Sequence, residues 1–187
     1  MVFGVLLAAL GFRLPTWRNK LLTGPPITAQ LIEADGMQKI LYAMHFIGRT
    51  SRTAAEVEVL RSNGSAISCM VTTVVAPSGV QTELKAATGG LAFFESELRL
   101  TGPEEFQENG EIAFGDDSGH VLRFSTIGRG HMALGLDPGV MAGTSSWKVE
   151  GGEGQFRQAR GFITSNFTIS DTGERNDFHC GLIFVPD

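Results

Sequence analysis

Apolar and polar side chains alternate in short runs along most of this chain. Alternation with a period of two is typical of a β-strand that has one buried face. Turn residues separate the runs, and no long stretch has the pattern of an amphipathic helix. The pattern predicts strands over 38–46, 53–60, 66–76, 91–100, 110–114, 120–127, 140–150, 161–169 and 176–185, and a weaker one over 80–87.

Glycine-containing pairs predict where the chain turns. Asn63-Gly64 has the composition of a tight hairpin turn. Residues 88–90 predict a break, and residues 128–139 predict a long loop. Many short strands joined by turns are typical of a β-barrel or a β-sandwich. Because no repeat or change of composition divides the 187 residues, we expect a single domain of this kind.

The composition suits a β-domain and excludes several functions. Glycine is frequent at 24 residues, and the aromatic side chains are mostly the 13 phenylalanines. The net charge of -5 and the lack of any run of Lys or Arg exclude nucleic-acid binding by neutralisation of phosphates. Motifs for nucleotide phosphates, for a nucleophilic serine and for a zinc protease are also missing from the sequence.

The cysteines and histidines do not predict a metal site. Cys69 and Cys180 are too few and too far apart for a cysteine zinc site, and the four histidines are scattered. We therefore expect no metal. The cysteines fit two half-buried strand thiols, with one disulfide in an oxidising compartment as the alternative.

A glycine-rich stretch connects two predicted strands near the end of the chain. The glycines within residues 151–154 suit a tight connection that uses positive φ. Phe156 and Ala159 are spaced to tuck one turn under the end of a barrel. Gly161 opens the next strand at a position where we expect that no side chain fits.

Residues 151–161 read Gly-Gly-x-Gly-x-Phe-x-x-Ala-x-Gly. This pattern resembles the signature of the dirigent proteins and is similar to that of the allene oxide cyclases, and both families are closed antiparallel β-barrels. The resemblance covers about the last quarter of the chain. It implies an all-β fold, a single antiparallel eight-stranded β-barrel of calycin-like or allene oxide cyclase-like form over 37–187. An irregular apolar N-terminal arm and lead-in would precede it over 1–36.

The resemblance also implies a function. Allene oxide cyclases and the related bacterial spirotetronate-type cyclases fold a reactive, mostly apolar substrate inside the barrel, and dirigent proteins steer phenolic intermediates. We therefore expect a cofactor-independent cyclase or isomerase of natural product biosynthesis that acts on a polyketide, terpenoid or oxylipin-like molecule. A non-catalytic lipocalin-like or dirigent-like barrel for a hydrophobic ligand is the alternative, and a structural or interaction protein is a third. The matching residues are structural in these families, so no catalytic residue is carried over.

Candidate acid–base residues lie on one face of the strand predicted over 91–100. Glu95, Glu97 and Arg99 share that face, which points either to water or into the lumen. In a dry lumen a carboxylate has a raised pKa and exchanges a proton near neutral pH. On that alternative we predict Glu97 and Glu95 as acid or base, with Arg123 and Arg99 holding the developing charge. Pairing of Arg123 with a carboxylate on a neighbouring strand is the structural alternative.

Substrate contacts are predicted from side chains on other strands. Tyr42 and Trp147 are able to stack on an unsaturated ligand, with a place in the core as the alternative. Asn166 follows the glycine-rich stretch and is placed to offer a hydrogen bond into the lumen. His179 is a further candidate, although a lone histidine on a strand is more often structural. Phe94 lies on the apolar face of its strand and is the last candidate.

The N-terminal segment is apolar from Val2 to Phe12. It is too short to span a bilayer as a helix, and no Lys or Arg precedes it as in a signal peptide. We expect an arm that packs on the barrel or on a partner subunit, which leaves a homodimer open, or contact with a membrane surface through residues 2–12. We expect a cytoplasmic location, with a secreted or membrane-associated one as alternatives.

Overall fold

The computed structural model describes residues 36–53, 56–115 and 119–187. Nine strands make up most of this part of the chain, and its helical element is a 3₁₀ turn, η2, over Gly154–Phe156. The strands are β1 (Met37–Thr53), β2 (Glu56–Ala76), β3 (Gly79–Leu100), β4 (Glu105–Phe114), β5 (His120–Thr126), β6 (Gly130–Leu134), β7 (Val140–Glu153), β8 (Arg160–Ser170) and β9 (Glu174–Pro186). None of the described residues belongs to a helix that is long and apolar enough to cross a membrane.

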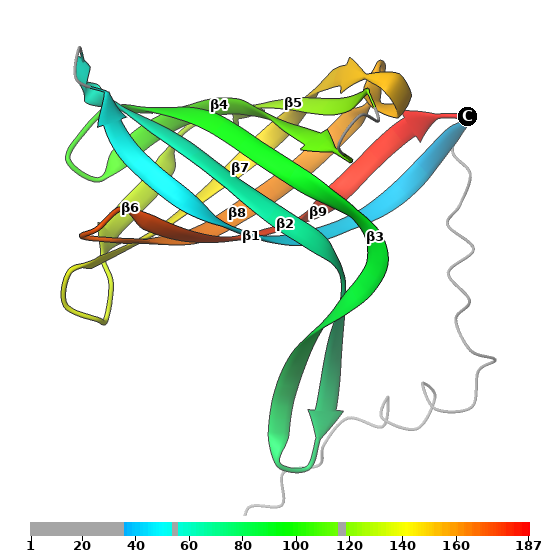
Figure 1. Cartoon of the computed structure of the whole chain (residues 1–187), viewed down its shortest axis with the longest axis horizontal. Coiled ribbons are helices and arrows are strands. Elements are labelled where there is room, and N and C mark those ends of the chain that lie inside the picture. Colours follow the sequence, from blue (N-terminus) through cyan, green and yellow to red (C-terminus); the bar gives the residue numbers. More distant parts are fainter. Residues whose placement is uncertain (1–35, 54–55, 116–118) are drawn as a thin grey trace, which may run out of the picture. The chain divides into compact units, whose positions relative to one another are not determined.

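Eight of the strands form a closed antiparallel ring. The order around it is β1, β2, β3, β4, β5, β7, β8 and β9, and the pairing of β9 with β1 closes it. The remaining strand, β6, pairs with the ends of β4 and β7. Figure 1 shows the strands crossing the ring at a slant. The predicted all-β fold with eight antiparallel strands is confirmed.

The interior of the ring is filled by the inward residues of the alternating strands. On β7, Ser145, Trp147 and Val149 are buried while their neighbours are exposed. The larger apolar cluster includes Phe46, Phe94, Ile112, Leu122, Phe124, Trp147, Ile163 and Ile183. Burying one such side chain stabilises a fold by about 1.5–3 kcal/mol, so this cluster is the main reason that the ring holds together.

The glycine-rich turn closes one end of the ring as predicted. Phe156 and Ala159 are buried, and the Phe156 ring packs on Phe114 with 5.1 Å between centroids. Gly154 has a φ of 59° and Gly161 a φ of 145°, both unfavourable for a residue with a side chain. A Cβ on Gly161 would lie 2.1 Å from the backbone oxygen of Leu182. The prediction that no side chain fits at Gly161 is confirmed.

Three local predictions are wrong. Residues 63–64 do not form a turn, because β2 runs straight through them. Gly64 instead pairs with Gly48 of β1, and a Cβ on Gly48 would lie 1.8 Å from the backbone oxygen of Asn63. Gly48 and Gly64 therefore allow β1 and β2 to approach each other closely. Residues 88–90 lie within β3, and β6 lies within the expected loop 128–139.

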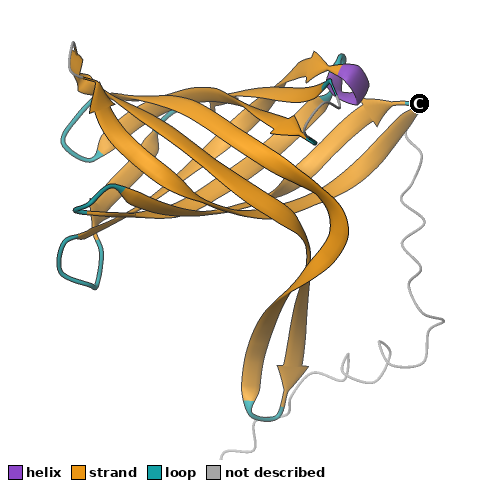
Figure 2. Cartoon of the chain, in the orientation of Figure 1, coloured by secondary structure: helices purple, strands orange, loops and turns teal. Residues whose placement is uncertain are grey.

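β2 and β3 extend beyond the ring as a two-stranded ribbon, residues 67–91. β1 pairs with β2 as far as Ser65, and β4 pairs with β3 from Ala92. Between these points the two strands pair with each other. Figures 1 and 2 show the ribbon leaving the ring and ending in a tight turn. This turn lies between the strands that were predicted over 66–76 and, more weakly, over 80–87.

The predicted arm and lead-in over 1–36 lie outside the described residues except for Gly36. The same is true of the suggested membrane or partner contact through residues 2–12. β1 begins at Met37, the residue at which the barrel domain was expected to start.

Candidate functional site

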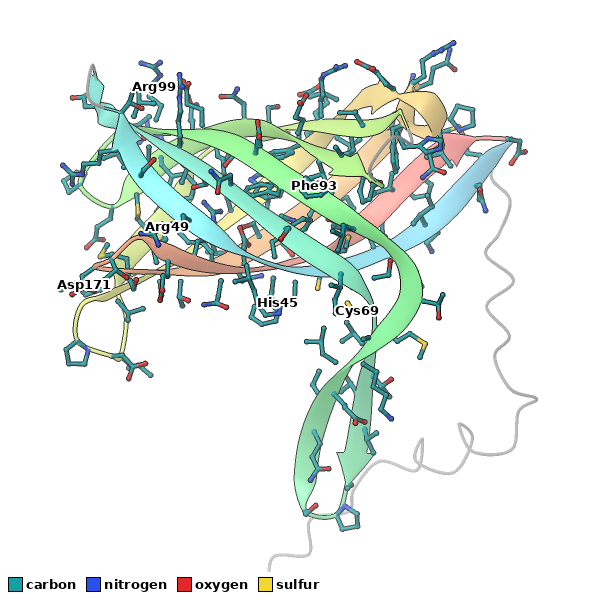
Figure 3. The ribbon with its side chains drawn as sticks, viewed as in Figure 1. His45, Arg49, Cys69, Phe93, Arg99 and Asp171 are labelled. Atoms are coloured by element: carbon teal, nitrogen blue, oxygen red, sulfur yellow. The ribbon has the colours of Figure 1, made fainter. Side chains whose placement is uncertain are left out.

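The predicted acid–base face of β3 lies on the outside of the ring. Glu95 and Arg99 are exposed and Glu97 is half-buried, because the alternate residues Phe94 and Leu98 point inward. Figure 3 shows Arg99 at the outer surface. Of the two predicted alternatives, the one in which this charged face meets water is therefore confirmed, and the one in which it lines the lumen is wrong. The strand hydrates its charged face and buries its apolar one, which avoids the cost of desolvating charges.

Arg123 and Asn166 also lie on the outer surface. Arg123 pairs with Glu153, and its Nε lies 3.6 Å from Oε2 of Glu111, so it has carboxylate partners on both neighbouring strands. The Asn166 side chain is exposed and accepts a hydrogen bond from Thr144 Oγ1 at 3.1 Å. For Arg123 the predicted alternative of pairing with a carboxylate on a neighbouring strand is confirmed. The predicted hydrogen bond from Asn166 into the lumen is wrong, because its side chain is on the outer surface.

Four of the predicted substrate-contact residues meet inside the ring. Tyr42, Phe94, Trp147 and His179 come from β1, β3, β7 and β9, and each is less than a tenth exposed. The centroid of the His179 ring lies 4.7 Å from that of Trp147, 5.2 Å from that of Phe94 and 6.4 Å from that of Tyr42. His179 is therefore enclosed by aromatic rings.

Charged side chains continue from His179 along β9. The period of two places Arg175, Asp177 and His179 on the inner face, and all three are buried. Asp177 Oδ2 accepts hydrogen bonds from Arg175 Nη2 at 2.6 Å and Nε at 3.0 Å. His179 Nε2 lies 3.1 Å from the same oxygen, but its direction is not that of a hydrogen bond, so the contact is electrostatic. The other imidazole nitrogen of His179, Nδ1, lies 3.5 Å from the Tyr42 hydroxyl.

Glu108 of β4 joins this buried group. Its Oε1 accepts hydrogen bonds from Ser96 Oγ at 2.7 Å and Arg175 Nη2 at 3.3 Å, and its Oε2 accepts one from Trp147 Nε1 at 3.2 Å. A buried carboxylate needs such partners to offset its desolvation. We refer to Tyr42, Glu108, Arg175, Asp177 and His179 as the interior polar series.

Burial and charge shift the pKa values of this series in opposite directions. Burial alone would raise the pKa of Asp177, but the neighbouring His179 and the charge of Arg175 hold it well below its usual range. The pKa of Glu108 is raised, because burial outweighs the charge of Arg175 and the hydrogen bond from Ser96. Burial, with the charge of Asp177, raises the pKa of Tyr42 well above its ordinary value, so its hydroxyl keeps its proton.

An opening in the wall of the ring reaches Tyr42. β1 pairs with β2 only from Ile47 onward, because the ribbon of β2 and β3 bends away from the ring there. Within the described part of the chain, β1 before Ile47 therefore has no strand on its β2 side. A cavity of about 430 Å³ lies here, and its lining includes Ile40, Tyr42, Met44, Ala92 and Phe114. Most of the lining residues are apolar, and Tyr42, whose hydroxyl lies 3.5 Å from His179 Nδ1, is one of them.

Sequence reasoning misses Arg175, Asp177 and Glu108 as site residues. Arg175 and Asp177 lie on the same face of β9 as the core residues Ile183 and Val185. This shared face is the sequence signal by which they could have been found. That signal was weak because the opposite face of β9 is also rich in apolar residues. Glu108 was missed because β4 was expected to begin at residue 110, whereas it begins at Glu105.

The cysteines and acidic groups add no metal site. Cys69 and Cys180 are free thiols, the first half-buried and the second exposed. Across the ranges that the structure describes, no group of three or more His, Cys, Asp or Glu side chains is placed to hold a metal ion.

No known protein-family profile matches the chain, and no curated protein sequence matches it. Among solved structures, a pterocarpan synthase dirigent protein aligns with 89% of this chain and 99% of its own, at 11% sequence identity and a TM-score of 0.32. A likeness at this level carries no argument about the fold or the activity of this chain.

Proposed function

We propose that this protein binds a small, mostly apolar molecule at the opening beside Tyr42 and promotes its cyclisation or isomerisation. The observation that carries the proposal is the interior polar series, which runs from the opening through Tyr42 and His179 to Asp177. The resemblance of residues 151–161 to the dirigent and allene oxide cyclase signature suggests the substrate class, a polyketide, terpenoid or oxylipin-like precursor.

Tyr42 is the group that would act on the substrate. Its hydroxyl keeps its proton because burial raises its pKa, so it is able to donate a hydrogen bond to a carbonyl or phenol oxygen and stabilise negative charge developing there. His179 would donate from Nδ1 to the Tyr42 oxygen, which leaves the Tyr42 hydrogen directed to the substrate. Asp177, whose Oδ2 lies 3.1 Å from His179 Nε2, would hold the imidazole in that orientation.

The reaction class needs no oxidant or reductant. In a cyclisation or isomerisation, substrate and product have the same composition, and Tyr42 donates only a hydrogen bond, so the atoms and electrons balance. The apolar lining would hold the substrate in the conformer that reacts and would exclude water. The remaining members of the series, Arg175 and Glu108, lie behind Asp177 and would position it.

The test is incubation of the purified full chain with candidate linear precursors, followed by mass spectrometry for a product of unchanged mass. Tyr42→Phe removes the hydroxyl and keeps the ring, so the rate should fall by about 100- to 1,000-fold. Glu95→Gln and Glu97→Gln alter residues on the outer face of β3 and should leave the rate unchanged. Unchanged turnover in Tyr42→Phe would remove Tyr42 from the mechanism.

A non-catalytic binding barrel is the second candidate. It is favoured by the dense packing of the interior, where the Trp147 and Phe124 rings stack with centroids 3.9 Å apart and leave the cavity at the wall as the place for a ligand. A carrier would hold its ligand at a fixed stoichiometry and convert none of it. Tyr42→Phe would then weaken affinity by only about tenfold, the loss of one hydrogen bond.

A further inference from the structure

The ribbon formed by residues 67–91 has no neighbouring strand on either edge in the part of the chain that the structure describes. An isolated two-stranded hairpin is only marginally stable in water. Unpaired strand edges and uncovered apolar side chains are also places where another chain binds. We therefore expect a ribbon of this length to be covered by another surface.

The two faces of the ribbon differ in chemistry. The register pairs Val71 with Leu84, Thr73 with Thr82 and Val75 with Val80, and these pairs share one face. Val75 is 80% exposed and Val80 is 68% exposed. We call this the apolar face.

The opposite face of the ribbon is more polar. It pairs Met70 with Lys85, Thr72 with Glu83 and Val74 with Gln81. Lys85 and Glu83 lie 3.2 Å apart and neutralise each other. The ribbon is therefore amphipathic, with one face suited to water and one suited to burial.

The apolar face continues onto the outer wall of the ring. A groove of about 340 Å³ joins Ile67, Cys69 and Leu84 of the ribbon to His45 and Ile47 of β1. Figure 3 shows Cys69 at the base of the ribbon and His45 on the outer side of β1.

Further along the same wall, Phe178 stacks on His45 with 4.1 Å between ring centroids, and it remains 45% exposed. Ile47 is 60% exposed. We call Ile47, His45 and Phe178 the wall patch.

The chemistry of the ribbon favours a protein partner over a lipid surface. Residues 67–91 contain no Trp, Tyr or Phe, and their charged residues are Glu83 and Lys85, which pair with each other. Membrane-surface elements carry excess Lys or Arg and interfacial aromatic residues. The net charge of -5 further opposes binding to anionic lipids. An uncharged apolar face is complementary to another uncharged apolar face.

The wall patch supplies such a face on every copy of the chain. Each copy would contribute the three residue pairs of the apolar face together with the wall patch, which is fewer than the roughly 20–30 residues a side of a standard interface, so we expect the association to depend on concentration. In a two-fold dimer each contact is made twice, since the same surface occurs on both copies.

We propose that the apolar face of the ribbon binds a second copy of this chain, against the wall patch of that copy. Cys69 borders both the groove and the opening beside Tyr42. The second copy would therefore cover the outer rim of the opening.

The test compares two neighbouring residues of β2 that point to opposite faces of the ribbon. Val71→Lys places a charge in the apolar face, and Thr72→Lys places the same charge on the polar face, opposite Glu83. Ile47→Lys alters the wall patch. The molar mass of each full-length chain is measured by light scattering and by sedimentation, from low micromolar to the highest soluble concentration.

We expect the wild type and Thr72→Lys to have at least twice the chain mass of 20.1 kDa. Val71→Lys and Ile47→Lys should have the mass of one chain, with self-association weakened by about 100-fold or more, since a buried unpaired charge costs several kcal/mol. The circular dichroism spectrum should be unchanged in all variants, because each altered residue is exposed. These readings separate loss of the interface from loss of the fold, and they do not depend on any activity.

Two results would overturn the proposal. One is a wild-type mass of a single chain at every concentration. The other is an unchanged mass in Val71→Lys. Sedimentation with phosphatidylcholine–phosphatidylglycerol vesicles is run in parallel. A monomeric wild type that pellets with the vesicles, and a Val71→Lys chain that does not, would assign the apolar face to lipid instead.

Discussion

At the residue scale, the buried charges of the ring interior are tolerated because each one is paired. Arg175 is the clearest case, since its guanidinium donates to Asp177, Ser62 and Glu108. It also lies over the Phe167 ring, with 4.2 Å from Cζ to the centroid. Removing one partner of such a group leaves an uncompensated buried charge, which is far more costly than the pair itself.

Asp177 and Glu108 should give the stability of the protein opposite dependences on pH. The lowered pKa of Asp177 means that its contribution is present above about pH 4 and is lost as the pH falls below that value. The raised pKa of Glu108 means that its contribution is greatest below about pH 4 and is lost as the pH rises through its shifted pKa.

The measurement is the free energy of unfolding in urea as a function of pH. Asp177→Asn should flatten the loss of stability on the acid side, and Glu108→Gln should flatten the loss as the pH rises from about 4. One group changes the slope by at most about 1.4 kcal/mol per pH unit. Both variants are expected to be less stable overall, so the slope is the informative quantity. Curves parallel to that of the wild type would contradict the assigned shifts.

At the element scale, the glycine-rich turn and the start of β8 show how local backbone geometry closes the ring. β8 begins beside β9, and Gly161 packs so closely on it that the backbone oxygen of Leu182 occupies the place of a Cβ. η2, which comes before β8 in the chain, places Phe156 in the core at the end of the ring. The turn is thus part of the core and more than a connection.

Gly161→Ala should cost about 2–5 kcal/mol in the free energy of unfolding, because backbone strain adds to a clash that the neighbouring strand has to absorb. Gly79→Ala is the matched control. Gly79 has a φ of 124°, and a Cβ there would meet no atom within 4 Å, so only the strain is introduced. Urea unfolding of both variants separates the two effects. Equal losses in both would mean that packing at Gly161 contributes nothing.

At the scale of the whole molecule, the barrel unit joins a densely packed ring to a thinly packed ribbon. The ring interior holds a large apolar cluster beside the interior polar series, and backbone pairing of the eight strands closes the ring. The ribbon residues between Met70 and Lys85 are exposed, and their backbone bonds face water. Regions with few buried contacts open at lower free energy than the global unfolding.

Hydrogen exchange should report this difference. In the Val71→Lys chain, amides of residues 70–85 should exchange orders of magnitude faster than those of β8 between Ile163 and Phe167, because only the latter belong to the ring core. Mass spectrometry of peptic peptides makes the comparison within one sample. Comparable protection in the two segments would show that the ribbon is stabilised by packing that the exposed side chains do not reveal.

The linear pattern of this chain determined that it is all-β, where most strands lie and where the glycine-rich turn closes the ring. Those features are local, because the period of two and positive φ act within a few residues. It also singled out Tyr42, Phe94, Trp147 and His179, although not their meeting point.

Only the tertiary structure decided which face of each strand is inside. Alternation has two solutions, and for β3 the closure of the ring turned Glu95 and Glu97 outward. The meaning of Asn63-Gly64 was likewise settled by its neighbours, since Gly64 faces Gly48 across a strand pair. Glu108 and Arg175 meet although they lie 67 positions apart. Such partners depend on strand register, which a one-dimensional pattern does not contain.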